Sequence, residues 1–158
     1  MELILTDEDA NRLIQIFKQT LKKYHIQLKE NDQGEILLHG IGSKKNGEFR
    51  LIYKLSPENK VINFIECKYN YCLFRININN SFHKNSDGTR VQGNRINMFS
   101  EEEFSLKGDG KTYMKAFALP FKNIRNTSDF LELFEDVIKF ANIVKNDNLN
   151  ISIQGSLL

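Results

Sequence analysis

Alternating apolar and polar residues in the middle of the chain constrain the fold more than any other feature. In residues 72–78, and again in residues 95–99, apolar side chains recur at every second position. This period is typical of a strand that buries one face. The outward positions carry Arg75, Asn77, Asn79, Arg95 and Asn97. Residues 80–93 are almost entirely polar, so the pattern predicts two half-buried strands joined by a long polar loop.

Shorter alternating segments on both sides of this stretch predict further strands. They cover residues 35–41, 48–55, 60–68 and 112–119. Polar and glycine-rich stretches predict a turn over 42–47 and a loop over 100–110. The carboxylates of Glu101–Glu103 in that loop are expected to be solvated, because three consecutive side chains cannot all face one point. Residues 146–158 are expected to pack as an irregular or strand-like extension.

Two amphipathic segments predict a helix on either side of the strands. Residues 7–24 follow a strong N-cap, Thr6, and place Lys18 on the solvent side. Residues 129–145 carry a broad apolar stripe. Both stripes are buried most simply if the two helices pack on the apolar face of the strands. The sequence therefore predicts one α+β domain over residues 1–158, a mainly antiparallel sheet of about six strands with both helices packed on it.

The charge balance identifies no partner by itself, because 22 Lys and Arg against 20 Asp and Glu give a net charge of +2. This near-neutral total does not favour direct nucleic-acid binding. Residues 61–100, however, hold five Lys and Arg against two acids, a local positive excess around the polar loop. The 18 Asn, 17 Ile and 16 Lys indicate the codon usage of a low-GC bacterium or its phages.

The location of the protein is predicted from what its first residues lack. They contain neither the basic segment nor the long apolar segment of a signal peptide. No apolar run approaches the ~20 residues of a membrane span. We therefore expect a cytoplasmic protein without membrane contact. Cys67 and Cys72 could face each other across a hairpin, where a cross-strand disulfide is conceivable, although reduced thiols are the default in this compartment.

Neither a catalytic motif nor a cofactor motif stands out. His25, His39 and His83 have no partner at metal-ligand spacing, and the two cysteines lack a second pair. The glycines beside Asp109 fit no phosphate-binding loop. His83 begins the polar loop, and as a general acid or base it would need an oriented partner such as Asp87. The sequence thus predicts no catalytic residue, no metal and no cofactor.

The polar loop and its flanking strands form the candidate binding face. Its members are outward or loop side chains: Arg75, His83, Lys84, Asp87, Arg90, Arg95 and Asn97. Arginines engage carboxylates and phosphates through paired hydrogen bonds, so we expect contact with a host or bacterial effector protein or a ribonucleoprotein. A merely solvated sheet face is the alternative. The acidic helix over 129–145 is a second candidate docking surface, although its apolar breadth favours burial.

The chain resembles a bacterial family catalogued only as a domain of unknown function, whose members are small proteins of Gram-positive genomes and their mobile elements. The resemblance lies mainly in residues 71–158, in the runs LFRININNSFHKNSDGTRVQGNRINMF, AFALPF, NTSDFLELFEDVIKFANI and IQGSLL. It implies a histidine at His83, then Asp87-Gly88, then a His-x-His on the returning strand. Arg95 and Asn97 stand at those two histidine positions. The resemblance therefore argues against enzymatic activity in this member.

We expect a small, non-catalytic binding protein encoded by a phage or mobile element. It would inhibit a host defence nuclease by direct binding, as anti-CRISPR inhibitors do, an expectation that rests on analogy. Two alternatives remain open. One is a hydrolase or ribonuclease centred on His83, and the other is an antitoxin-like partner of a toxin.

Overall fold

The computed structural model describes residues 2–42 and 46–153. The helices are α1 (Asp7–Gln15), α2 (Glu101–Lys107) and α3 (Phe130–Phe140). The large sheet has the order β1 (Lys18–Thr20), β3 (Asp32–Gly40), β4 (Glu48–Ser56), β5 (Asn59–Glu66), β6 (Cys72–Ile78), β9 (Arg95–Phe99) and β10 (Met114–Ala118). Two small sheets pair β2 (Tyr24–Leu28) with β11 (Leu149–Ile153) and β7 (Phe82–Lys84) with β8 (Arg90–Gln92).

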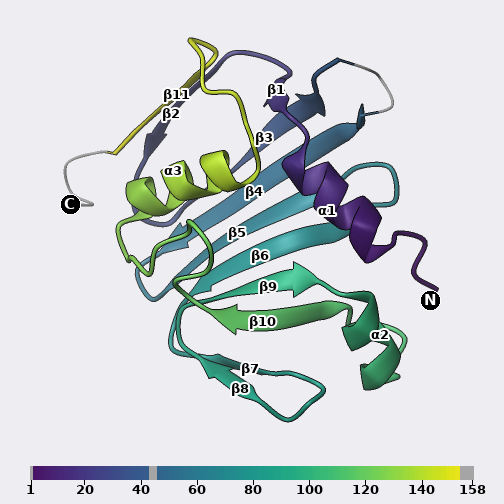
Figure 1. The fold of residues 1–158 in the computed structure, drawn as a ribbon. Coiled ribbons are helices and arrows are strands. Elements are labelled where there is room, and N and C mark those ends of the chain that lie inside the picture. Colours follow the sequence, from purple (N-terminus) through teal and green to yellow (C-terminus); the bar gives the residue numbers. More distant parts are fainter. Residues whose placement is uncertain (1, 43–45, 154–158) are drawn as a thin grey trace.

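The predicted α+β fold is confirmed. All neighbouring strands of the seven-stranded sheet are antiparallel. α1 and α3 lie on the same face of this sheet (Figure 1). Leu13 of α1 and Phe134 of α3 belong to one hydrophobic cluster with the strands. The sheet is wider than expected, because β1 adds a strand at one edge.

Three phenylalanine rings form the centre of the helix-covered face. Phe49 stacks on Phe64 with ring centroids 5.3 Å apart, and Phe64 stacks on Phe74 at 5.1 Å. Phe140 meets the Phe74 ring edge-on at 5.2 Å. Such pairs contribute about 0.5–1.5 kcal/mol each beyond the area they bury. The ladder therefore fixes β4, β5 and β6 relative to α3.

The N-terminal helix is shorter than the predicted 7–24. It ends at Gln15, and Ile16 adopts an extended backbone with φ −63° and ψ 149°. The following residues form β1 and β2, which pair with β3 and β11. Leu21, expected on the apolar stripe, is exposed. Pairing with distant strands prevails over helix propensity here, because residues 16–28 are rich in β-branched and aromatic side chains.

A helix, α2, occupies the segment predicted as the loop 100–110. Its N-cap is Ser100, whose hydroxyl accepts a hydrogen bond of 3.1 Å from the Glu103 backbone N–H. Its C-terminus is closed by Gly108 at φ 63°, a left-handed conformation that glycine adopts without strain. The acidic side chains in the first turn stabilise the helix, because they lie at the positive end of its dipole. The loop prediction is wrong, because Ser100 and Glu103 form a Ser-x-x-Glu pattern that starts a helix here.

The remaining boundaries agree with the predicted elements to within a few residues, except that α3 ends at Phe140 rather than residue 145. The turn predicted over 42–47 and the tail over 146–158 lie partly outside the described residues. The described part of the tail forms β11, the predicted strand-like extension. Within the described residues, every helix is too short or too polar to cross a bilayer.

Lys18 is a charged side chain buried at the junction of α1, β1 and α3. Its exposed fraction is 0%, so the predicted solvent position was wrong. Its ammonium donates hydrogen bonds of 2.7–2.8 Å to the backbone carbonyls of Ile14, Ile16 and Ala141. Ile14 lies in the last turn of α1, and Ala141 is the C-cap of α3. The ammonium therefore satisfies carbonyls that would lack a partner at two helix C-termini.

Further contacts tie Lys18 to the sheet and to the chain after α3. Its Nζ lies 5.0 Å from the Phe49 ring centroid and 5.2 Å from that of Phe64. Its backbone N–H donates to the Asn142 carbonyl at 3.0 Å, and its carbonyl accepts from the Val144 N–H at 2.7 Å. Among the described residues, no carboxylate forms an ion pair with it. Burial lowers the pKa of Lys18 to about 7.

We expect Lys18→Met to remove a pH dependence of stability. The unfolded chain keeps its Lys18 proton up to about pH 10.5, whereas the folded chain releases it above a pKa of about 7. The free energy of unfolding of the wild type should therefore rise with pH between these values, by up to about 1.4 kcal/mol per pH unit relative to Lys18→Met. Urea unfolding of both proteins across this range measures the difference. If the difference in unfolding free energy between the two proteins does not change with pH, the three carbonyls keep Lys18 protonated over the whole range.

Candidate binding surface

The segment predicted as a polar loop, residues 80–93, folds into the β7–β8 hairpin. Phe82 pairs with Gln92 and Lys84 with Arg90 in an antiparallel register. The turn is closed by Gly88 at φ 89°, a conformation that favours glycine. The loop prediction is thus corrected to a short hairpin with a defined backbone.

Asn85 attaches the hairpin to the edge of the large sheet. Its side chain is buried, and its amide nitrogen donates to the Ala116 carbonyl at 3.0 Å. Its amide oxygen accepts from the Ala116 N–H at 2.9 Å. Ala116 lies in β10, the last strand of the sheet (Figure 1). The side chain therefore satisfies both hydrogen-bonding groups that a further strand would pair with at this residue.

Two residues of α2 hold the same hairpin. Glu103 is buried, and its carboxylate accepts hydrogen bonds from the Ser86 backbone N–H at 3.1 and 3.2 Å and from the Ser86 hydroxyl. The Lys107 ammonium donates to the Lys84 carbonyl at 2.7 Å. The expectation that all three carboxylates of Glu101–Glu103 are solvated is therefore wrong for Glu103. A buried carboxylate requires such donors to offset the loss of hydration.

Arg95 fastens the base of the hairpin from β9. One guanidinium nitrogen, Nη1, donates to Asn79 Oδ1, the Ser81 carbonyl and the Gly93 carbonyl at 2.8, 3.2 and 2.9 Å. The side chain is only 7% exposed. The predicted solvent-facing position of Arg95 is therefore wrong, because oxygens at both ends of the hairpin surround the guanidinium. Arg95 positions the surface from within.

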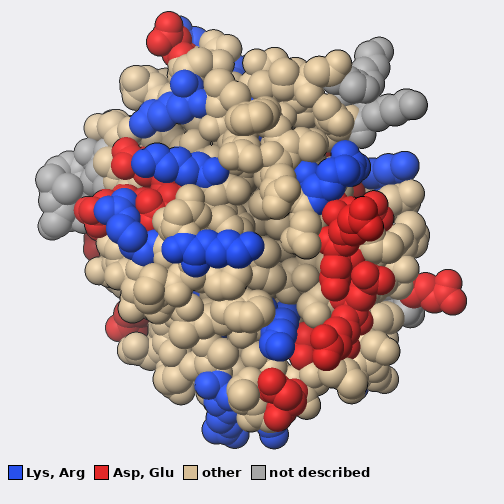
Figure 2. All heavy atoms as spheres, viewed as in Figure 1, with Lys and Arg blue, Asp and Glu red and all other residues tan. Residues whose placement is uncertain are grey.

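The exposed part of the hairpin presents an aromatic ring and a guanidinium together. Phe82 is 47% exposed, and the Arg90 guanidinium lies 4.5 Å from its ring centroid. Lys84 and Asp87 are also exposed, as is Arg75 on β6. Figure 2 shows basic and acidic side chains side by side over the hairpin, in the lower part of the view, whereas acids gather over the first turns of α1 and α2.

His83, Arg95 and Asn97 share a different property. Each has a buried polar atom without a hydrogen-bond partner in the described part of the chain: His83 Nε2, Arg95 Nε and Asn97 Oδ1. Burial, with the positive charges of Lys107 and Arg95, lowers the pKa of His83. The imidazole is therefore neutral at pH 7. Asp87, the suggested partner of His83, instead accepts hydrogen bonds from Thr89.

The cysteines and the other acidic groups of the described residues form neither a disulfide nor a metal-binding cluster. Cys67 and Cys72 are both free thiols. Burial raises the pKa of Cys72 to about 12, so this thiol stays protonated at neutral pH. Over residues 2–42 and 46–153, no group of three His, Cys, Asp or Glu side chains is arranged to hold a metal ion. His25 and His39 lie apart in β2 and β3.

Asn85 and Glu103 are site residues that the sequence analysis missed. The Ser-x-x-Glu pattern at Ser100 could have revealed the helix that carries Glu103. Nothing in the sequence near Asn85 indicates that it pairs with Ala116, which is 31 residues away. Of the predicted members, Arg75, Lys84, Asp87 and Arg90 are exposed, whereas Arg95 is buried and His83 and Asn97 are partly buried.

Asn85→Ala should destabilise the protein by about 1–3 kcal/mol, because two buried backbone groups of Ala116 lose their partners. Urea unfolding measures this loss. Amide hydrogen exchange should also become faster in the hairpin and in β10. Asn123→Ala, at an exposed position, is the matched control. Equal midpoints for the two variants would contradict the proposed anchoring.

His83→Gln should reduce the loss of stability in acid. Because the folded-state pKa of His83 lies below its ordinary value of 6.5, the unfolded chain binds more protons as the pH falls below 6.5. The wild type should therefore lose stability from pH 6.5 downward until the folded-state pKa is passed. His83→Gln should lose less stability than the wild type over this pH range. Parallel curves for His83→Gln and the wild type in urea unfolding would exclude this contribution.

Comparison with known proteins identifies the family of the chain. Residues 5–143 match the model of a family described as a family of unknown function (DUF6978). No curated protein and no solved structure matches the chain. The matched region contains the β7–β8 hairpin and its anchors, and it extends the resemblance noted in the sequence toward α1. The chain therefore belongs to this family of unknown function, DUF6978.

Proposed function

We propose that the protein is a non-catalytic binding protein whose β7–β8 hairpin contacts a protein or ribonucleoprotein partner. The observation that carries this proposal is the exposed Phe82 ring stacked with the Arg90 guanidinium on a hairpin that is fixed at several points. Aromatic residues and arginine are the side chains that most often dominate the affinity of an interface.

The anchoring of the hairpin supports this role. Asn85, Glu103, Lys107 and Arg95 hold its turn, the end of β7 and its base through side-chain hydrogen bonds. A surface that is ordered before binding loses less conformational entropy when the partner arrives. The β7–β8 hairpin is therefore ordered enough to form a specific contact.

Charge indicates the chemistry of the partner. Arg75, Lys84 and Arg90 are exposed in this part of the molecule, and Asp87 is the exposed acid of the hairpin itself. Guanidinium groups bind carboxylates and phosphates in paired geometry. An acidic protein patch or the phosphates of a bound RNA would complement this surface, with faster association at low salt.

Within this class, we propose an inhibitor of a host defence nuclease, of the anti-CRISPR type, carried by a phage or mobile element. The support is the small size of the chain, its composition and its exposed basic hairpin, and the step from these to inhibition is an analogy. An antitoxin-like role would use the same surface on a toxin. The identity of the bound protein separates these two roles.

The competing sites have less support. The acids of α3 are engaged within the chain: Asp136 and Glu132 bind Arg125 at 3.0–3.1 Å, and Glu135 lies 3.9 Å from Lys145. A hydrolase centred on His83 would need an accessible imidazole nitrogen with an oriented partner. His83 Nε2 is buried and has no partner among the described residues.

The test begins with capture of the partner from a host lysate by the tagged protein and its identification by mass spectrometry. Purified partner is then titrated with the wild type and with the double variant Phe82→Ser/Arg90→Glu. We expect at least a tenfold loss of affinity and a weaker salt dependence, because the variant removes a central aromatic and reverses one charge. If the partner is a nuclease, the wild type should block its cleavage and the double variant should not.

The matched control is Phe17→Ser/Lys29→Glu, which alters an exposed aromatic and an exposed cation away from the hairpin. Both double variants must unfold cooperatively. If the hairpin variant binds as tightly as the control, the hairpin is not the interface. Turnover of a nucleic acid or an ester that is lost in His83→Ala would overturn the non-catalytic proposal.

A further inference from the structure

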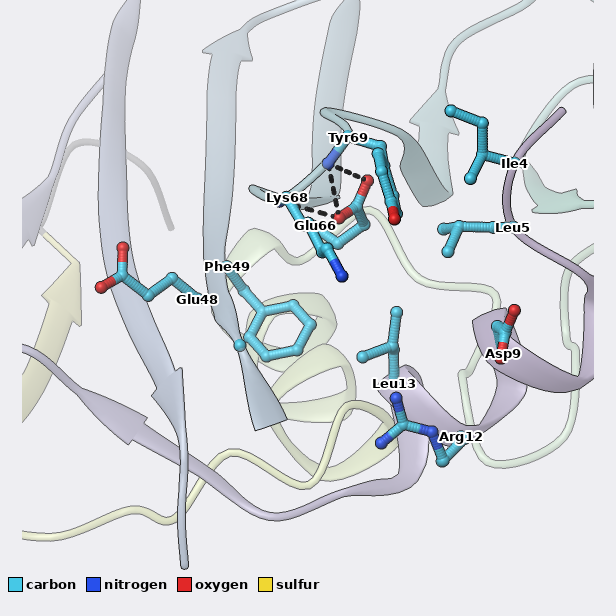
Figure 3. A pocket seen from close by; sticks show the side chains of 11 residues that line it. Ile4, Leu5, Asp9, Arg12, Leu13, Glu48, Phe49, Glu66, Lys68 and Tyr69 are labelled. Carbon is cyan, nitrogen blue, oxygen red and sulfur yellow. Dashed lines mark hydrogen bonds between the residues drawn. The ribbon is translucent and has the colours of Figure 1, made fainter. Parts of the chain in front are cut away.

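A second region of interest is a cavity of about 220 Å³ between α1, the start of β4 and the turn that joins β5 to β6 (Figure 3). It contains no residue of the β7–β8 hairpin. Its volume is below the ~300–1,000 Å³ of typical ligand pockets, so a ligand would be smaller than a nucleotide. The cavity and the hairpin are therefore separate candidates.

The floor of the cavity is apolar and rigid. Leu5, Leu13 and Phe49 line it and are buried members of the hydrophobic core. Phe49 is held in the ladder of stacked rings. Tyr69 lines the cavity from the β5–β6 turn (Figure 3). The Phe49 ring is fully covered, so an apolar ligand body placed here would contact Tyr69 and the exposed parts of Leu5 and Leu13.

Two carboxylates of the lining are already engaged. The oxygens of Glu66 accept hydrogen bonds from the backbone N–H groups of Lys68, Tyr69 and Tyr71 at 2.8–3.2 Å. The carboxylate of Asp9 accepts from the Thr6 N–H at 3.2 Å as part of the α1 capping box. These hydrogen bonds hold the β5–β6 turn and the first turn of α1, and they reduce the capacity of both groups to pair with cations in the cavity.

The two cations of the lining are Arg12 and Lys68, and the Lys68 ammonium lies 5.2 Å from the Tyr69 ring centroid. Neither Arg12 nor Lys68 forms an ion pair among the described residues. Lys68 reaches from the turn toward the space between Phe49 and Leu13, and Arg12 extends from α1 beside Leu13 (Figure 3). Glu48, the remaining acid of the lining, is exposed at the start of β4. The cavity thus combines an apolar floor with two available positive charges.

We propose that this cavity binds a small organic carboxylate with an apolar body, of the size of benzoate or phenylacetate. The apolar body would lie on Leu5, Leu13 and Tyr69, and the carboxylate would be bound by Lys68 and Arg12. A hydrogen bond between an ionised donor and a carboxylate is roughly twice as strong as a neutral one. The site does not depend on the proposed function of the hairpin.

The test titrates the full-length protein with phenylacetate and follows amide chemical shifts by two-dimensional NMR at constant ionic strength. Saturable shifts are expected at residues around the cavity, including Leu13 and Tyr69, and none in the hairpin. The neutral analogue phenylacetamide and inorganic phosphate should each bind at least tenfold more weakly, since one lacks the charge and the other lacks the apolar body. Equal binding of either probe would overturn the proposal.

Lys68→Gln, and separately Arg12→Gln/Lys68→Gln, should weaken phenylacetate binding at least tenfold. Both positions are exposed, so the fold should be retained, and the single variant suffices if the double variant unfolds. Lys139→Gln, an exposed position on α3, is the matched control and should bind as the wild type. Unchanged affinity of the Lys68 variant, non-saturable shifts, or shifts confined to another region would each refute the site.

Discussion

The buried amino group of Lys18 makes the contacts on which the arrangement of helices on the sheet depends. It is bound by carbonyls from the ends of α1 and α3, and it lies over the rings of Phe49 and Phe64. A buried cation is costly unless its donors are all satisfied. The position of each helix is therefore coupled to that of the other, since a shift of either would remove acceptors from the same charge.

Both edge strands of the large sheet, β1 and β10, form hydrogen bonds with segments outside the sheet. The contact at β10 fixes the position of the hairpin. At the β1 edge, the residues after α3 bridge to Lys18. At the β10 edge, Asn85 pairs with Ala116. An open edge would allow another chain to add a strand. The hairpin thus covers an edge while it presents Phe82 and Arg90 outward.

The sequence was sufficient to predict β3, β4, β5, β6, β9 and β10 of the large sheet and helix α3, because their local patterns agree with their environment. Phe49, Leu51 and Tyr53 alternate in β4 and are buried, and Phe134 and Val137 of the predicted apolar stripe are buried in α3. Among the charged residues, the wrong predictions concern Lys18, Arg95 and Glu103. Each is a charged residue that local pattern places in water, yet each is surrounded by hydrogen-bonding groups from other segments. Such surroundings are a property of the tertiary fold.

The parallel pairing of β2 with β11 has a consequence for biosynthesis. Tyr24–Leu28 emerges from the ribosome early, but its partner Leu149–Ile153 is made more than a hundred residues later. The same delay applies to Lys18, whose acceptor Ala141 lies 123 residues further along. Until then β2 has no partner strand, and Lys18 lacks one of its three carbonyl acceptors. The pairing of β2 therefore cannot be completed before residue 153 has left the exit tunnel, and an unpaired strand edge of this kind is exposed to unwanted pairing until then.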